Sequence, residues 1–200
     1  LASGLHTITV GAIDRAGNEA EASVSVTIDN ATPFVAITAP LSDAAVSGLI
    51  TISVQASDAI SGIASVFLYI DGVLRATRNE APFNFPLNTL LFSSGQHTIT
   101  ATGIDNCGNQ GDVNITIFFD HEAPTVSITG PASGAVISGI ITVSVEASDS
   151  ISAVAGVTLY VDNQPHSTLK TPPFDFTVDT SGLAPGVHTL TASALDKAGN

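Results

Sequence analysis

The stretch HTITATGIDNCGN, residues 97–109, is one of three closely similar segments in this sequence. HTITVGAIDRAGN occupies residues 6–18 and HTLTASALDKAGN occupies residues 188–200, so both intervals are 91 residues. The same register relates other positions without a gap, namely Pro33 to Pro124, Gly48 to Gly139, Asp58 to Asp149 and Phe83 to Phe174. Repetition at one fixed interval indicates a tandem array, and 91 residues are enough for a complete small domain.

Apolar and polar residues alternate within each repeat. In LITISVQAS, residues 49–57, every second residue is apolar, and the counterpart at residues 140–148 keeps this pattern. Such alternation is typical of a β-strand with one buried face. The pair Asp71-Gly72 lies between two further alternating runs and predicts a hairpin turn. With about seven short strands and no helix in each repeat, the sequence predicts an all-β fold of tandem Ig-like antiparallel β-sandwiches joined by short Pro-containing linkers.

The register divides the chain into three parts. Residues 1–29 correspond to the last two strands of a repeat, residues 30–120 to a complete repeat, and residues 121–200 to a repeat without its last strand. Because an isolated hairpin is marginally stable in water, we expect further polypeptide to complete both ends. Further repeats of a longer chain are favoured over strand complementation by other copies of the same chain. Strand complementation between copies would not require the chain to carry the repeated HTIT strand at both of its ends.

Composition excludes several classes of partner. The chain has 18 acidic and 5 basic residues, and its formal charge of −13 repels nucleic acid and anionic membrane surfaces. Divalent cations are compatible with this charge. The single Cys107 excludes an internal disulfide, and no apolar run is long enough to insert into a membrane as a helix. The first residues, LASGLHT, contain neither an initiator Met nor a signal peptide, so we expect a longer parent protein.

Three segments of the last repeat carry a family resemblance: VSITGPASGAVISG at residues 126–139, LYVD at 159–162, and PPFDFTVDTSGLAPGVHTLTASALDKAGN at 172–200. They resemble the bacterial Ig-like tandem repeats of secreted and cell-surface proteins, and the resemblance covers essentially the whole chain. It implies an extracellular or cell-surface location and a structural role in a filament, stalk or surface layer, as a mechanical spacer or polymerising unit. The alternatives are an adhesin or carbohydrate-binding module, or the spacer of a secreted polysaccharide-degrading enzyme.

Motifs of catalysis are absent from the sequence. It contains no nucleophile elbow, phosphate-binding loop or zinc-binding HExxH segment. Serine, histidine and aspartate residues recur at the same positions in each repeat, which favours a structural role over a catalytic one. We therefore predict that this segment is not an enzyme, and that calcium is the one cofactor to consider.

Acidic residues recur at three places that an Ig-like topology brings to one pole of a sandwich: the linker, the loop after the second strand, and the turn before the last strand. The predicted groups are Asp29, Asp58 and Asp105, and then Asp120, Asp149 and Asp196, with Glu122 as a further candidate. Ca²⁺ prefers six to eight oxygen ligands, which such loops supply. The hypothesis is an interdomain calcium ion that stiffens the linker. The alternative is that these are exposed carboxylates that stabilise the D-x-x-G-N turns.

The histidine that begins each repeated segment lies on the inward-facing side of its strand. For His6, His97 and His188 we predict a buried imidazole that hydrogen-bonds the backbone of the preceding turn. A metal-binding or catalytic role is the alternative, although no second histidine or zinc-type glutamate lies nearby in the sequence.

Further candidate residues lie on the predicted surface. Asn30 and Asn114 begin N-x-[ST] sequons and are candidate glycosylation sites, and Asn114 is on the outward side of its strand. Cys107 replaces an alanine and is predicted to be a small, half-buried residue, with a disulfide between chains as the alternative. Tyr69 and Tyr160 are predicted to point outward, where they would contact a neighbouring chain or a sugar unless a loop covers them.

Overall fold

A computed structural model describes residues 1–200, and its regular elements are β-strands apart from one turn of 3-10 helix at Thr89–Leu91. None of the elements is a helix of the length and apolarity that a membrane span requires. Contacts between Cα atoms group the chain into two compact units, one made of 1–42, 51–86 and 98–115, the other of 43–50, 87–97 and 116–200. The repeat boundaries expected after residues 29 and 120 stay a prediction.

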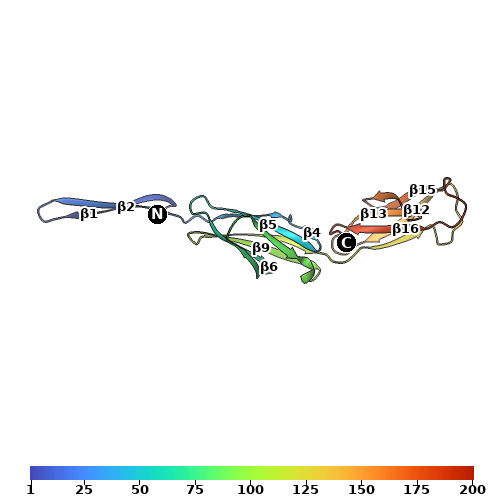
Figure 1. Ribbon diagram of the computed structural model, residues 1–200, viewed down its shortest axis with the longest axis horizontal. Helices are drawn as coiled ribbons and strands as arrows, with labels where there is room; N and C mark the ends of the chain where they lie inside the picture. Colours follow the sequence, from blue (N-terminus) through green and yellow to red (C-terminus); the bar gives the residue numbers. More distant parts are fainter. The chain divides into compact units, whose positions relative to one another are not determined.

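The first part is a hairpin. Strands β1 (Gly4–Ile13) and β2 (Glu19–Ile28) pair antiparallel in a two-stranded sheet (Figure 1). They begin 91 residues before β9 (Gly95–Asp105) and β10 (Gln110–Phe119), which are neighbours in the middle repeat. The hairpin therefore has the strand positions that the repeated sequence predicts.

The middle repeat contains two sheets, with strand orders β3-β5-β8 and β4-β10-β9-β6-β7. In addition to β9 and β10, its strands are β3 (Phe34–Ala39), β4 (Ala45–Val46), β5 (Leu49–Ser57), β6 (Ile63–Ile70), β7 (Val73–Arg78) and β8 (Phe83–Asn88). The pairings of β3 with β5, of β6 with β7 and of β6 with β9 are antiparallel, whereas the short β4 pairs in parallel with β10.

The last repeat contains two three-stranded sheets, with orders β11-β12-β15 and β14-β13-β16. Its strands are β11 (Thr125–Gly130), β12 (Ile140–Ser148), β13 (Val154–Val161), β14 (Gln164–Leu169), β15 (Phe174–Asp179) and β16 (Leu190–Asp196). Both sheets contribute to one core, whose buried residues are Val143, Val145, Val157, Leu159, Phe174, Phe176 and Val178. Strand β16 lies at the edge of its sheet.

The buried positions recur every 91 residues. Ile52 and Val143 are both 0% exposed, and Phe85 and Phe176 are 1% and 2% exposed. Burial alternates along β5 and β12 as the apolar pattern predicts, and each fully buried side chain of this size contributes on the order of 1.5–3 kcal/mol. These positions confirm the 91-residue register and the all-β sandwich fold.

The hairpin predicted at Asp71-Gly72 is present. Ile70 pairs with Val73, so the loop between them has two residues. Both loop residues have positive φ, 51° and 75°, as a type I′ turn requires. The equivalent loop of the last repeat connects β13 and β14 in the same way.

Candidate metal centre

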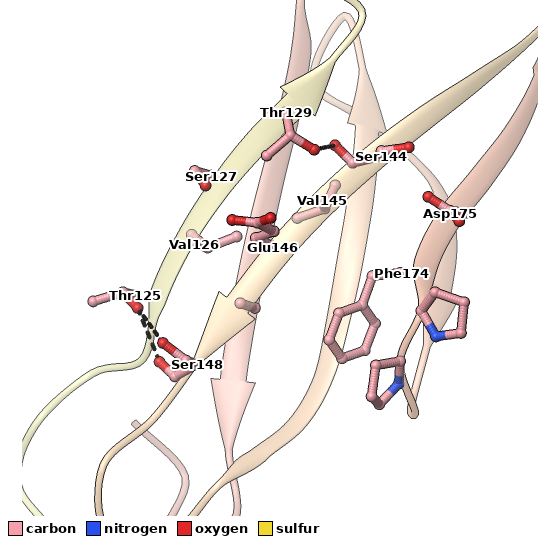
Figure 2. A pocket seen from close by; sticks show the side chains of 13 residues that line it. Thr125, Val126, Ser127, Thr129, Ser144, Val145, Glu146, Ser148, Phe174 and Asp175 are labelled. Carbon is pink, nitrogen blue, oxygen red and sulfur yellow. Dashed lines mark hydrogen bonds between the residues drawn. The ribbon is translucent and has the colours of Figure 1, made fainter.

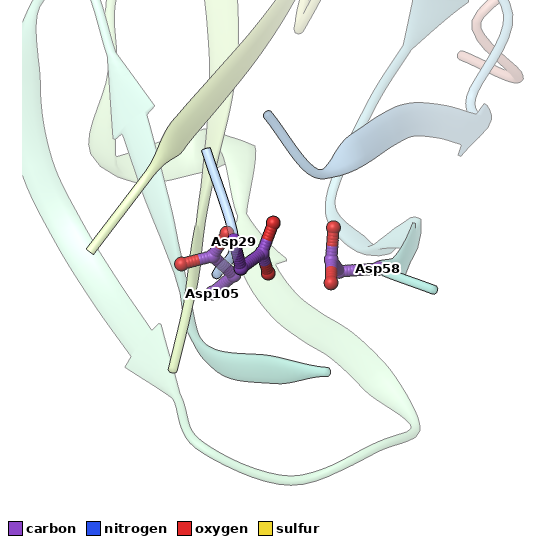
Figure 3. A group of neighbouring side chains, drawn as sticks. All are labelled: Asp29, Asp58 and Asp105. Carbon is purple, nitrogen blue, oxygen red and sulfur yellow. The ribbon is translucent and has the colours of Figure 1, made fainter. Parts of the chain in front are cut away.

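The first predicted acidic group comes together where three segments of chain meet. Asp29 directly follows β2, Asp58 directly follows β5, and Asp105 is the last residue of β9. One carboxylate oxygen from each residue can be chosen so that all three lie within 4.8 Å of one another (Figure 3). The convergence that the Ig-like topology predicts is therefore present.

The second group repeats this arrangement. Asp120 directly follows β10, Asp149 directly follows β12, and Asp196 is the last residue of β16. Their carboxylate oxygens also lie within 4.8 Å of one another. Glu122 does not belong to this group, because its side chain is exposed and its backbone N–H donates to Asp120 Oδ1 at 3.2 Å. Two equivalent groups of three aspartates thus lie at equivalent places in the two repeats.

The D-x-x-G-N turn holds Asp105 in place. Its Oδ1 accepts hydrogen bonds from the backbone N–H groups of Cys107 at 2.8 Å and Asn109 at 2.9 Å. The side-chain amide of Asn109 donates to Oδ2 at 2.7 Å. Gly108 has a φ of 90°, which favours glycine at this position. The aspartate therefore stabilises the turn and also contributes to the acidic group, so the two sequence-based interpretations are compatible.

The asparagine that ends the turn is a residue whose further role the sequence reasoning missed. The amide of Asn109 also donates to the backbone carbonyl of Asp29 at 3.2 Å, and Asn200 makes the equivalent bond to the carbonyl of Asp120 at 2.9 Å. Each asparagine thus ties two of the three segments together. The signal was its recurrence at the end of all three copies of the repeated segment.

Asp58 is oriented by the loop that follows it. Its Oδ1 accepts hydrogen bonds from the backbone N–H groups of Ile60 at 2.9 Å, Ser61 at 2.8 Å and Gly62 at 3.3 Å. Asp149 is held by the corresponding loop through the same oxygen. Because these bonds converge on Oδ1, Oδ2 of each residue is left for another partner.

Asp29 and Asp120 are buried with one oxygen unsatisfied. Asp29 is 8% exposed and Asp120 is 0% exposed. Oδ1 of Asp29 accepts a hydrogen bond from the N–H of Ala31 at 3.0 Å, but the buried Oδ2 of each aspartate has no hydrogen-bond partner. An unsatisfied buried carboxylate oxygen costs free energy, and such atoms are uncommon in folded proteins.

Hydrogen bonds hold the pKa of three of these carboxylates, Asp58, Asp105 and Asp149, below the ordinary value for aspartate. The hydrogen bonds from Ser61 and Ile60 lower the pKa of Asp58 below its ordinary value of 3.8. Burial, the largest single effect, raises the pKa of Asp105, but the bonds from the Asn109 side chain and backbone outweigh it and the pKa is lowered overall. Burial and the opposing backbone bonds act in the same way on the pKa of Asp149, which is also lowered.

The charge and the donor set define what these groups can bind. The hydrogen bonds to the carboxylates come from neutral backbone N–H, serine and asparagine groups, which do not cancel the negative charge. The ligand atoms are oxygens, and neither group includes a histidine or a cysteine. Such a set favours a hard cation over zinc or copper.

The histidine prediction is confirmed in full for His97. Its Nε2 lies 2.9 Å from the carbonyl oxygen of Ser93, four residues earlier, and the residue is 7% exposed. His6 and His188 make the equivalent bond at 2.7 Å, but both are only half-buried. None of the three histidines belongs to an acidic group.

Cys107 was predicted to be half-buried, and this prediction is wrong. The residue is exposed, because the turn directs its backbone N–H to Asp105 and its side chain outward. Asn114 is exposed on β10, as its strand parity predicts. Asn30 is exposed too, although its amide donates to the carbonyl of Leu1 at 3.3 Å. Glycosylation at Asn114 and Asn30 stays a prediction.

A groove over the β11-β12-β15 sheet has a lining of mixed polarity. Five serine and threonine residues line it with Glu146 and Asp175, beside six apolar residues, and the one aromatic ring in it, Phe174, is 5% exposed (Figure 2). Tyr69 and Tyr160 are half-buried and alternate with the buried residues of β6 and β13, so they lie on the side of their strands that faces away from the core, as predicted.

One solved structure of fibronectin(III)-like modules shares this fold, and two further structures match the chain less closely. The chain is 20% identical to the Clostridium thermocellum CbhA fibronectin(III)-like modules, covering 83% of this chain and 87% of that one with a TM-score of 0.56. A 1.5-MDa bacterial ice-binding adhesin matches at 23% identity, with 100% and 71% of the chains covered and a TM-score of 0.43. A tetra-tandem repeat from the extending region of a large adhesion protein matches at 24% identity, with 100% and 55% covered and a TM-score of 0.37.

The search of curated proteins found no significant match. The model of the bacterial Ig domain, by contrast, matches residues 33–101 and again residues 124–192. These two segments make up more than half of the chain and begin 91 residues apart. The chain therefore belongs to the bacterial Ig domain family and contains two tandem copies of that domain.

Proposed function

We propose that this chain is a structural segment of an extracellular or cell-surface protein, in which Ig-like repeats act as mechanical spacers or polymerising units. The observation that carries this proposal is the gapless 91-residue register of the cores, in which seven apolar strand positions are buried in both repeats. Repeats without loop insertions offer little surface for a specialised catalytic or binding cleft. A non-catalytic role is part of the proposal.

Stretching single molecules tests the mechanical role. We expect each repeat to unfold in one cooperative event that releases roughly 250–300 Å of chain, because an extended residue spans about 3.3–3.6 Å. The measurement is the force and the step length when the chain is pulled from its two ends. Unfolding without resolvable force peaks would contradict the proposal, and so would specific binding in a glycan array.

We also propose that the β1–β2 hairpin packs against a repeat of the same kind, in a longer chain or in another copy. Ile8 and Val10 are 52% and 67% exposed, whereas Ile99 and Ala101, at the equivalent positions of β9, are 0% exposed. The same strand pattern thus buries its apolar side chains in the middle repeat, where other strands cover them. Covering this face would remove apolar surface from water.

Sedimentation measures this association between copies. The chain is expected to self-associate as its concentration rises, and Ile8→Asp is expected to weaken the association because it places a charge on the apolar face. Thr9→Asp is the matched control, since Thr9 is on the opposite side of the strand and is already exposed. A monomer at every concentration would rule out pairing between copies of this chain.

A further inference from the structure

The geometry points to a calcium-binding site in each of the two aspartate groups, Asp29 with Asp58 and Asp105, and Asp120 with Asp149 and Asp196. We propose that each group binds one Ca²⁺ ion. This inference does not depend on the mechanical role, because a spacer without a bound ion is still a spacer.

The unsatisfied buried oxygens are the first argument. Oδ2 of Asp29 and Oδ2 of Asp120 are buried and have no hydrogen-bond partner. Each belongs to a residue at least nine-tenths buried, and each residue faces two other carboxylates. A carboxylate oxygen that faces further carboxylates is repelled by them, and a cation placed among them turns this repulsion into attraction. Figure 3 shows the three side chains of the first group beside one another.

The second argument is that the ligands are held in place before the ion binds. Three backbone N–H groups bind Oδ1 of Asp58, and the Asn109 amide and two N–H groups bind Asp105. These bonds fix both side chains and still leave lone pairs free, because a carboxylate has about four acceptor positions. Little conformational entropy is then lost when an ion binds.

The ligand type and spacing favour calcium. Two oxygens on opposite sides of one Ca²⁺ lie about 4.6–5.2 Å apart, since each Ca–O distance is about 2.3–2.6 Å. The carboxylate oxygens of each group lie within 4.8 Å of one another, so one ion can contact all three without a large movement of the backbone. Mg²⁺ requires shorter bonds and near-ideal octahedral geometry, to which carboxylates from three separate segments are less suited.

An ion at the first site would join the chain after β2 to the loop after β5 and to the end of β9. These segments are far apart in sequence, and the Asn109 amide already connects two of them. Binding to the folded state alone raises the unfolding temperature by mass action. At a free Ca²⁺ concentration about 100 times the dissociation constant, we expect a rise of about 10–20 °C for a domain of this size.

Calorimetric titration of the metal-stripped 200-residue chain tests the proposal. With CaCl₂ we expect a stoichiometry of two ions per chain, and with MgCl₂ we expect clearly weaker binding. Asp58→Asn and Asp149→Asn are each expected to remove one of the two ions. Asparagine keeps an oxygen that accepts the hydrogen bonds of the loop, so both variants are expected to keep the wild-type circular dichroism spectrum without calcium.

Asp175→Asn is the matched control, because Asp175 is an exposed aspartate outside both groups. It is expected to leave the stoichiometry at two. The proposal would be overturned if the wild-type chain took up no calcium, if Mg²⁺ bound as tightly as Ca²⁺, or if Asp175→Asn lost as much binding as the two site variants. The wild-type titration decides the question even if a site variant fails to fold.

Discussion

The middle and last repeats use the same histidine in two different ways. His97 is 7% exposed, and its ring stacks on Phe119 with the ring centres 4.3 Å apart. His188 has a side chain that is 27% exposed, and its Nδ1 lies 2.6 Å from Oδ2 of Asp162. Both rings bond the carbonyl of the residue four positions earlier. Phe119 lies on β10, and residues 121–200 do not include the positions 91 residues after that strand. The comparison teaches that the local bond follows from the repeated sequence, whereas the enclosure of the ring depends on whether that strand is present.

Removal of a core phenylalanine gives the largest expected effect and tests whether the two cores are equivalent. Phe85→Ala and Phe176→Ala are each expected to lower the free energy of unfolding by about 3–5 kcal/mol, because each leaves a large cavity. Chemical denaturation of each variant checks this. Clearly unequal losses would show that the two repeats do not share one packing arrangement.

Replacement of the equivalent histidines is expected to lower the stability of the two repeats by different amounts. His97→Ala removes a stacked ring and leaves the Ser93 carbonyl without its partner, so we expect a loss of about 1–3 kcal/mol. His188→Ala removes a half-exposed ring and is expected to cost less. Denaturant unfolding of both variants measures the difference, and an equal or larger effect at His188 would contradict this account.

The loops that hold Asp58 and Asp149 differ at one position. Gly62 has a φ of 72°, and its counterpart Ala153 has a φ of 63°, a conformation that is strained for alanine. A Cβ on Gly62 would meet its nearest neighbour at 3.7 Å, so Gly62→Ala has room but acquires the same strain. We expect Gly62→Ala to destabilise the fold by about 1 kcal/mol and Ala153→Gly to stabilise it by less. Thermal unfolding of both variants measures these changes. If neither variant differed from the wild-type chain in unfolding temperature, the loop would relax without strain.

The pH dependence is expected to give the smallest effect. The bond to the Ala184 carbonyl and then the Asp162 carboxylate raise the pKa of His188 above its ordinary value of 6.5. The stability that this pair contributes is complete below pH 6.5 and is lost as the pH rises through the raised pKa. The unfolding temperature, followed from about pH 6 to 9, is expected to fall less in His188→Gln than in the wild-type chain. Parallel curves of unfolding temperature against pH for the two proteins would contradict a stabilising interaction between His188 and Asp162.

Much of the candidate site could be predicted from the sequence, because an Ig-like topology brings the ends of particular strands to one pole. The six aspartates were identified in this way, and their oxygens do converge. The exposure of Cys107 and the bonding partner of the recurring Asn109 could not be predicted. They depend on the directions that a tight turn gives to its side chains and on a carbonyl 80 residues away in the chain.

The sequence by itself determined the period, the strand positions and the buried face, because each of these follows from local alternation and from residues that recur every 91 positions. Only the tertiary structure decided that Oδ2 of Asp29 and of Asp120 is buried without a partner, and that His97 is enclosed while His188 is half-exposed. Burial is a property of which strands lie against one another, and residues distant in the chain determine that contact. Similar local sequences therefore have different surroundings where the strands that lie against them differ.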